Sequence, residues 1–252
     1  MDSIRAPAGQ QDARLEISGR SFVEAVFIFA KEVQRATDRP LADILQSSTP
    51  LHRWFDSKAH YERFLDGVEE ESNPADRIIR TRDDVERRKR YVAESNRDSK
   101  LFGPFTFDYV HRTIIIHFAN RPKATSPLSD GEMDARIDNL RDMFSHIKQM
   151  FPGATTVRST GSWLLNLEQY TRLFPLSYRK SIKERPHIKN VVDMGLWGQL
   201  VDHKHQLKQQ AFDEVLRNLR ERGPDNLEGL FKYPVCTAKA PIQDFYNFYK
   251  IK

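Results

Sequence analysis

The chain has 252 residues, 39% of them hydrophobic and 30% charged, and it carries 16 Phe, 8 Tyr and 3 Trp. This apolar content is enough for a folded core, which excludes a wholly disordered chain. The 40 Lys and Arg and the 35 Asp and Glu leave a net charge of +5, which is small relative to the number of charged groups. The charge therefore permits an acidic partner without requiring one.

The single cysteine, Cys236, excludes an intramolecular disulfide and a zinc site built from cysteines. Such a chain suits a reducing compartment. Residues 1–14 lack the apolar segment of a signal peptide, and the apolar run 25–30 is much shorter than the roughly 20 residues of a membrane-spanning helix. We therefore expect a cytoplasmic protein that has no membrane partner.

The N-terminal part of the chain is predicted to be a flexible tail, residues 1–14, followed by a helical region, residues 15–100. Within that region, apolar residues recur at helical spacing in 21–37, and two shorter helical patterns surround Pro50. Residues 69–100 are the most polar segment. Their acidic and basic side chains nearly cancel, which favours a solvated helix at the junction with the next domain.

Two apolar runs, 105–110 and 113–118, are rich in β-branched and aromatic residues and predict an antiparallel hairpin. The helix predicted at 129–151 has the strongest pattern in the chain. Ser129 and Glu132 form a capping-box pattern, and Pro152 with Gly153 ends the helix. Its apolar stripe consists of Met133, Ile137, Leu140, Phe144, Ile147 and Phe151.

Beyond this helix, the sequence predicts strands from Val157 and at 191–200, and helices at 167–174 and 204–222. The many aromatic residues near the C-terminus indicate that this tail is docked. We therefore expect an α+β protein with a mixed, mainly antiparallel central sheet flanked by helices, in which residues 101–252 form one α/β domain.

His117 lies in a very apolar strand, where it could act as a general base or make a structural hydrogen bond. The structural role is the commoner one for a histidine in such surroundings. Asn120, in the loop that follows, could add a polar contact to a substrate.

A second candidate site lies in the segment 161–166, which contains Ser162, Trp163 and Asn166. Ser162 follows a glycine at a strand end, where a ligand can approach the backbone. The Gly-x-Ser-x-Gly motif of hydrolases is absent, because position 164 is Leu. Trp163 could equally be a core aromatic residue.

A third candidate site combines Trp197 and Gln199 with the polar group Asp202, His203 and His205. Carboxylate and imidazole are common metal ligands, but the spacing matches no standard zinc signature, so no metal is expected. His203 remains a candidate base. The basic segment 177–190 could bind the phosphates of a cofactor through Arg179, Lys180 and Lys183. Neither a P-loop nor a dinucleotide-binding glycine motif is present.

Five short motifs between Phe102 and Ile251 carry a resemblance to an uncharacterised family of bacterial proteins. That family has no established activity, so the resemblance implies a fold unit and no catalytic role. The motifs are Ile116-His-Phe-Ala-Asn120, Gly161-Ser-Trp-Leu-Leu-Asn166, Tyr170-x-x-Leu-Phe-Pro175, Leu196-Trp-Gly-Gln199 and Ala240-Pro-Ile-x-x-Phe-Tyr-x-Phe-Tyr249.

The central part of the chain also resembles acyltransferase-type domains of the GNAT superfamily. The resemblance rests on His117 at a strand end, Pro127-Leu128, the helix 129–151, the segment 162–165 and Leu173-Phe-Pro175. It implies a GNAT-like sheet and an acyl thioester such as acyl-CoA as cofactor. The Gln/Arg-x-x-Gly-x-Gly/Ala signature that binds the coenzyme A pyrophosphate in active members is absent from this sequence.

Three functions remain open. The first is an acyltransferase-like enzyme acting on a small-molecule substrate, with His117 or His203 as base and Ser162 as a polar contact. The second is a non-catalytic module that binds a protein partner through aromatic residues at 54–64 and near the C-terminus. The third is nucleic-acid binding through 77–90 and 179–189, which the near-balance of charges makes the least favoured. No oligomeric state is predicted.

Overall fold

The computed structural model describes residues 8–55, 57–68, 101–118, 125–185, 192, 194–204 and 206–252. The chain divides into two compact units. The helical unit comprises residues 1–95 and 189–231, and the sheet unit comprises residues 96–188 and 232–252. This division differs from the predicted one, because residues 189–231 belong with the N-terminal helices instead of with the sheet.

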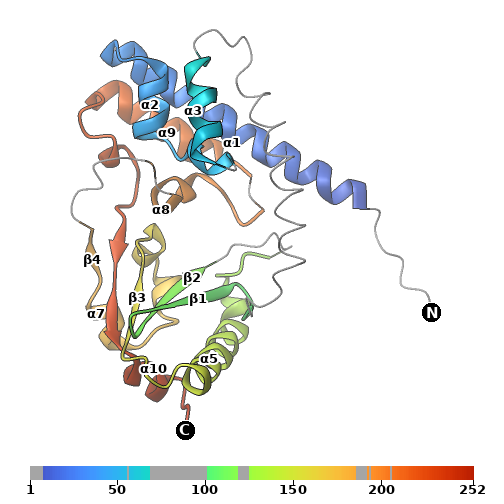
Figure 1. Ribbon diagram of the computed structural model, residues 1–252, viewed down its shortest axis with the longest axis vertical. Helices are drawn as coiled ribbons and strands as arrows, with labels where there is room; N and C mark the ends of the chain where they lie inside the picture. The colour runs from blue at the N-terminus through green and yellow to red at the C-terminus, as the bar shows by residue number, and fades with distance from the viewer. Residues whose placement is uncertain are drawn as a thin grey trace. The chain divides into compact units, whose positions relative to one another are not determined.

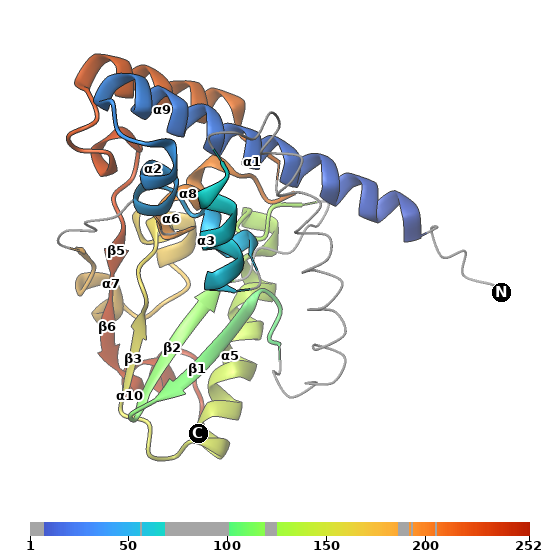
Figure 2. The same ribbon diagram turned by 45° about the horizontal axis from the view of Figure 1, so that its top comes forward.

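The helical unit is built around the long helix α1, which lies alongside α9 in both views (Figures 1 and 2). Trp197 of this unit is fully buried, with the ring of Phe29 edge-on at 5.1 Å and that of Phe231 at 5.5 Å. The helical elements of this unit are α1 (Ala8–Thr37), α2 (Leu41–Ser48), η1 (Leu51–Trp54), α3 (Lys58–Asp66), α8 (Met194–Trp197), η4 (Gly198–Leu200), α9 (Gln209–Arg222) and η5 (Glu228–Leu230).

Two sequence predictions fail in this unit. Helix α1 begins at Ala8, so residues 8–14 are helical, whereas a flexible tail was predicted for 1–14; residues 1–7 lie outside the described part of the chain. The strand predicted at 191–200 is also wrong, because α8 and η4 occupy 194–200. A short apolar run has no periodicity that separates a strand from a buried helical turn.

The sheet unit contains a four-stranded sheet in the order β1-β2-β3-β6. The pairs β1/β2 and β3/β6 are antiparallel, and β2/β3 is parallel, so the predicted mixed, mainly antiparallel sheet is confirmed. Its elements are β1 (Phe105–Val110), β2 (Thr113–Phe118), η2 (Asp130–Glu132), α5 (Met133–Met150), β3 (Thr156–Ser159), η3 (Trp163–Asn166), α6 (Glu168–Thr171), α7 (Leu176–Lys180), β4 (Lys183–Glu184), β5 (Cys236–Thr237), β6 (Lys239–Pro241) and α10 (Ile242–Phe248).

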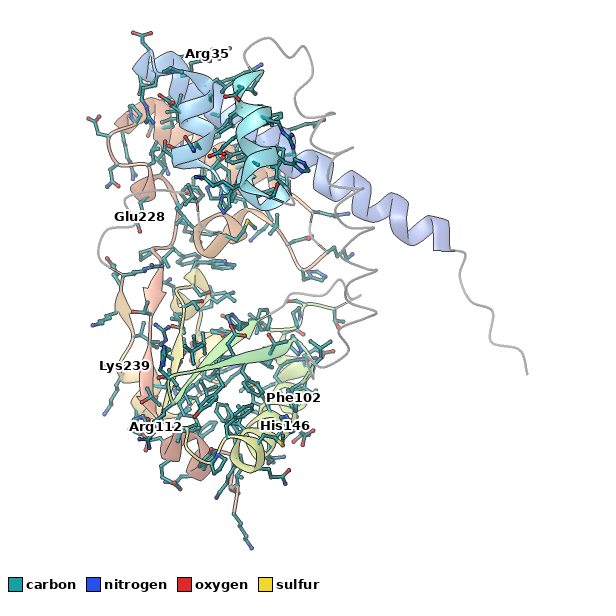
Figure 3. All side chains as sticks on the ribbon, viewed as in Figure 1. Arg35, Phe102, Arg112, His146, Glu228 and Lys239 are labelled. Atoms are coloured by element: carbon teal, nitrogen blue, oxygen red, sulfur yellow. The ribbon has the colours of Figure 1, made fainter. Side chains whose placement is uncertain are left out.

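One face of this sheet packs on α5 and α10 and forms the core of the unit (Figure 2). Phe105, Ile114 and Val157 are fully buried on it. Phe102, just before β1, packs on His146 of α5 with ring centroids 5.6 Å apart (Figure 3). Because side chains alternate along a strand, the neighbours of these residues on each strand point to the opposite side of the sheet. We call that side the open face because Asp108, Arg158 and Lys239 on it are exposed, although Ile115 on the same side is buried.

The hairpin between β1 and β2 turns at His111 and Arg112, which have positive φ angles of 47° and 63°. Such a two-residue turn matches the twist of the flanking strands. The guanidinium of Arg112 donates to the carbonyl of Gly153 at 2.9 Å, which joins the turn to the end of α5 (Figure 3). No helix in the described part of the chain is both long and apolar enough to cross a membrane.

Candidate functional site

His117 and Asp108 form a hydrogen-bonded pair on the open face of the sheet. His117 is directly opposite Thr106 in the β1/β2 register, and Asp108 lies two residues further along β1, so the two side chains are diagonal neighbours. Their Nε2 and Oδ2 atoms are 2.8 Å apart. The side chains are 36% and 64% exposed, which leaves the pair accessible to a substrate.

The hydrogen bond fixes which imidazole nitrogen can act as a base. An ionised carboxylate only accepts, so Nε2 of His117 donates to Asp108. In the neutral ring the lone pair is then on Nδ1, which has no hydrogen-bond partner among the described residues. Asp108 thus orients the ring. The sequence prediction missed Asp108, although the hairpin register brings it within reach of His117.

Ser162 has a structural role in this fold. Its hydroxyl accepts from the backbone N–H of Leu164 at 3.1 Å and caps η3. Its own backbone N–H and C=O pair with Cys236. These bonds hold the segment that begins η3 against β5, and they account for the serine without a nucleophilic role.

Asn166 and Trp163 also brace this segment. The amide nitrogen of Asn166 donates to the carbonyls of Trp163 and Pro234, both at 2.8 Å, and its oxygen accepts from the thiol of Cys236 at 3.6 Å. The rings of Trp163 and Tyr233 stack with centroids 6.0 Å apart. Trp163 and Asn166 therefore lie close together in the sheet unit, where the side chain of Asn166 is hydrogen-bonded to the backbone of neighbouring segments.

The remaining predicted site residues that the structure describes do not all belong to the same unit. Trp197 is in the core of the helical unit, and Gln199 in η4 is 6% exposed. His203 is in the helical unit too, and its Nε2 is buried with no hydrogen-bond partner in the described ranges. Asp202 Oδ1 accepts from the backbone N–H groups of Lys204 and Gln206, as in a turn. Asn120 lies outside the described residues.

No group of three metal-binding side chains occurs among the described residues, and His205 is outside them. Two carboxylates of η2, just before α5, are paired with arginines: Glu132 with Arg136, and Asp130 with Arg172. Negative side chains stabilise a helix N-terminus and repel a phosphate there.

Arg179, Lys180 and Lys183 are exposed and make no ion pair with a described residue. Two further cations, Arg158 and Lys239, are exposed on the open face and were not predicted as site residues. Their proximity follows from the pairing of β3 with β6, which joins segments far apart in the chain.

Most aromatic residues of the predicted docking patches pack inside the units instead. Tyr61 and Phe64 of α3 are buried, and Tyr246 and Tyr249 are buried at the C-terminus; Phe248, 42% exposed, is the exception there. The side chain of Trp54 lies outside the described part of the structure. No family model, curated protein or solved structure matches the chain.

Proposed function

We propose that this protein is an acyltransferase-like enzyme that transfers an acyl group from a thioester to an amine or hydroxyl of a small molecule. One observation carries the proposal, the 2.8 Å contact between His117 Nε2 and Asp108 Oδ2 on the accessible face of the sheet. A positioned histidine oriented by a carboxylate is the arrangement that removes a proton from such a nucleophile. The proposal includes a cytoplasmic location, where the free thiol of Cys236 stays reduced.

In the proposed reaction, Nδ1 of His117 takes the proton of the acceptor while the acceptor nitrogen or oxygen attacks the thioester carbonyl. A carbon–nitrogen or carbon–oxygen bond forms, and the carbon–sulfur bond of the tetrahedral intermediate then breaks. The leaving thiolate takes the proton back from the imidazolium. The carboxylate of Asp108 stabilises the positive charge on the ring between the two transfers.

The place of His117 in the topology supports this proposal. Strands β2 and β3 are parallel neighbours joined through α5, and ligands of such β-α-β units bind beyond the carboxyl ends of the strands. His117 is the penultimate residue of β2. The arrows of β2 and β3 end on the same side of the sheet in Figure 2. The base is therefore at the edge where a substrate of this architecture is expected.

The test is a screen of the purified chain with acyl thioesters of different chain length against a panel of amines and alcohols. The readouts are release of the free thiol and mass spectrometry of the product. His117→Ala should lower the rate by about 10²- to 10⁴-fold, the usual contribution of a general base. His111→Asn is the matched control, because His111 is an exposed histidine of the same hairpin whose positive φ suits asparagine.

Neither variant removes a buried side chain, so both should fold, and thermal unfolding checks this. Acyl transfer by the native protein that is lost only in His117→Ala supports the proposal. Full activity of His117→Ala, or no acyl transfer with any donor and acceptor, contradicts it.

A further inference from the structure

The open face carries a pair of like charges that no described acidic side chain neutralises. Arg158 of β3 is directly opposite Lys239 of β6 in the antiparallel register, and both side chains are exposed. Neither makes an ion pair with a described residue. Like charges directly opposite each other in a sheet are destabilising. An anion bound between the two would remove that repulsion.

Lys183 extends this positive charge onto the next strand. Cys236, Ala238 and Ala240 are buried in the core, so the residues between them, Thr237 and Lys239, point to the open face. Lys183 is opposite Thr237 in the β4/β5 register and therefore points to the same side. It is exposed and has no ion-pair partner within the described ranges.

Arg185 continues the row toward the end of β3. Its backbone N–H donates to the carbonyl of Val235 at 2.9 Å, and a Cβ atom added at Gly161 would lie 3.3 Å from its guanidinium. Gly161 is part of a β-bulge, since both Thr160 and Gly161 are opposite Thr237, and its φ of 134° requires glycine. The glycine thus lets the guanidinium lie against the backbone on the open face.

We propose that this row of cations binds the sugar–phosphate backbone of a single-stranded nucleic acid. We call it the basic row, meaning Arg158, Lys239, Lys183 and Arg185. Adjacent strands are about 4.8 Å apart, so the row spans about 10 Å from β3 to β4, enough for consecutive phosphates. All four side chains are exposed instead of enclosed in a cavity, which favours a polymer over a small phosphorylated ligand.

A stacking surface lies where the basic row ends. Trp163 follows Gly161 by two residues, and its ring is parallel to that of Tyr233 within 19°. Both rings are half-buried, and Nζ of Lys232 is 5.2 Å from the centroid of the Tyr233 ring. Aromatic rings beside a positive surface stack the bases of single strands without strong sequence preference. Asp108, an acidic side chain on the open face, is hydrogen-bonded to His117.

Fluorescence anisotropy with labelled single-stranded DNA and RNA oligonucleotides tests the proposal, with no acyl donor present, so that failure here does not bear on acyl transfer. The native chain should bind at low salt, with an affinity that falls steeply as salt rises. Replacing Arg158 and Lys239 by Gln should weaken binding at least about tenfold. It should also lower the magnitude of the salt slope, the slope of log affinity against log salt concentration, by about 1.4, or 0.7 for each lost phosphate contact.

The matched control replaces two exposed lysines of the helical unit, Lys31→Gln and Lys58→Gln, which changes the net charge by the same amount. Trp163→Leu should weaken binding by loss of stacking while the salt slope stays unchanged. The thermal midpoint of the Arg158→Gln/Lys239→Gln variant should not fall, since a repulsion is removed. The proposal is overturned if the native chain does not bind at low salt, or if the control variant loses as much affinity as the Arg158→Gln/Lys239→Gln variant. It is also overturned if the chain prefers duplex to single strands, or if inorganic triphosphate competes equally well at the same phosphate concentration.

Discussion

The hydroxyl of Tyr249 donates a hydrogen bond to the backbone carbonyl of Leu173, and the two oxygens are 2.6 Å apart. Tyr249 is 1% exposed, and its ring stacks on Phe144 of α5 with centroids 5.4 Å apart. This one side chain thus connects the C-terminal residues to α5 and to the turn after α6. The end of the chain is an integral part of the core of the sheet unit.

Tyr249→Phe tests the energetic value of this bond. The substitution keeps the ring but leaves the carbonyl of Leu173 without its donor, so the free energy of unfolding should fall by about 1–2 kcal/mol. Urea denaturation followed by circular dichroism measures the change. Tyr109→Phe is the control. Tyr109 is 38% exposed, so removing its hydroxyl should change the free energy of unfolding by less than about 0.5 kcal/mol. Equal effects of the two variants would contradict a specific role for the bond.

Three tyrosines of the same core should make the protein sensitive to alkali. Burial raises the pKa of Tyr170, Tyr178 and Tyr249, and mutual repulsion of the phenolates adds to the shift in Tyr170 and Tyr249. A raised folded-state pKa gives stability that is complete below the unfolded value near 10 and is lost as pH rises above it. We expect absorbance at 295 nm to show these phenols ionising only together with unfolding. Reversible ionisation of all eight tyrosines near pH 10 in folded protein would contradict this.

Gly103 is a position where any side chain should be costly. Its φ is 59°, and an added Cβ would lie 2.0 Å from Oδ1 of Asn139, which accepts from the buried Arg136. Gly103→Ala should therefore destabilise the protein by at least about 2 kcal/mol, from backbone strain and displacement of that contact. Gly131→Ala, where a Cβ meets nothing within 4 Å, should change stability by less than about 0.5 kcal/mol. The two predictions are checked by comparing the denaturant midpoint of each variant with that of the native protein.

Cys236 should be a poor nucleophile in the folded protein. It is 4% exposed, and burial raises the pKa of its thiol; the charge of Glu184 adds to the shift, and the hydrogen bond to Asn166 opposes it. Reaction with Ellman's reagent at pH 8 should be much slower in native buffer than in guanidinium chloride, since the thiolate is the reacting form. A native rate equal to the denatured one would show an accessible thiol.

The sequence predicted the local elements of the sheet unit well, because their patterns are strong. The β-branched residues of 113–118 and the turn at His111 and Arg112 place the hairpin, and the observed strands have the predicted bounds. The helix at 129–151 is present as η2 and α5, but its capping box is not made. The hydroxyl of Ser129 donates to the carbonyl of Ser126, and Glu132 instead pairs with Arg136.

The parts that were missed depend on contacts between distant segments. The proximity of Arg158 and Lys239 requires the register of β3 against β6, which no local pattern specifies. The structural role of Ser162 and Asn166 likewise depends on the pairing with residues 234–236. Asp108 is different, because counting alternate residues along a two-residue hairpin would have placed it beside His117.

A double-mutant cycle on His117 and Asp108 tests the proposed chemistry most directly. The rate of thiol release would be measured for the native protein, Asp108→Asn, His117→Ala and the double variant, with the same donor and acceptor. If the two side chains act as one base, the double variant should be no slower than His117→Ala, and Asp108→Asn should show an intermediate rate. Losses that multiply in the double variant, or rates equal to that of the native protein, would contradict the account.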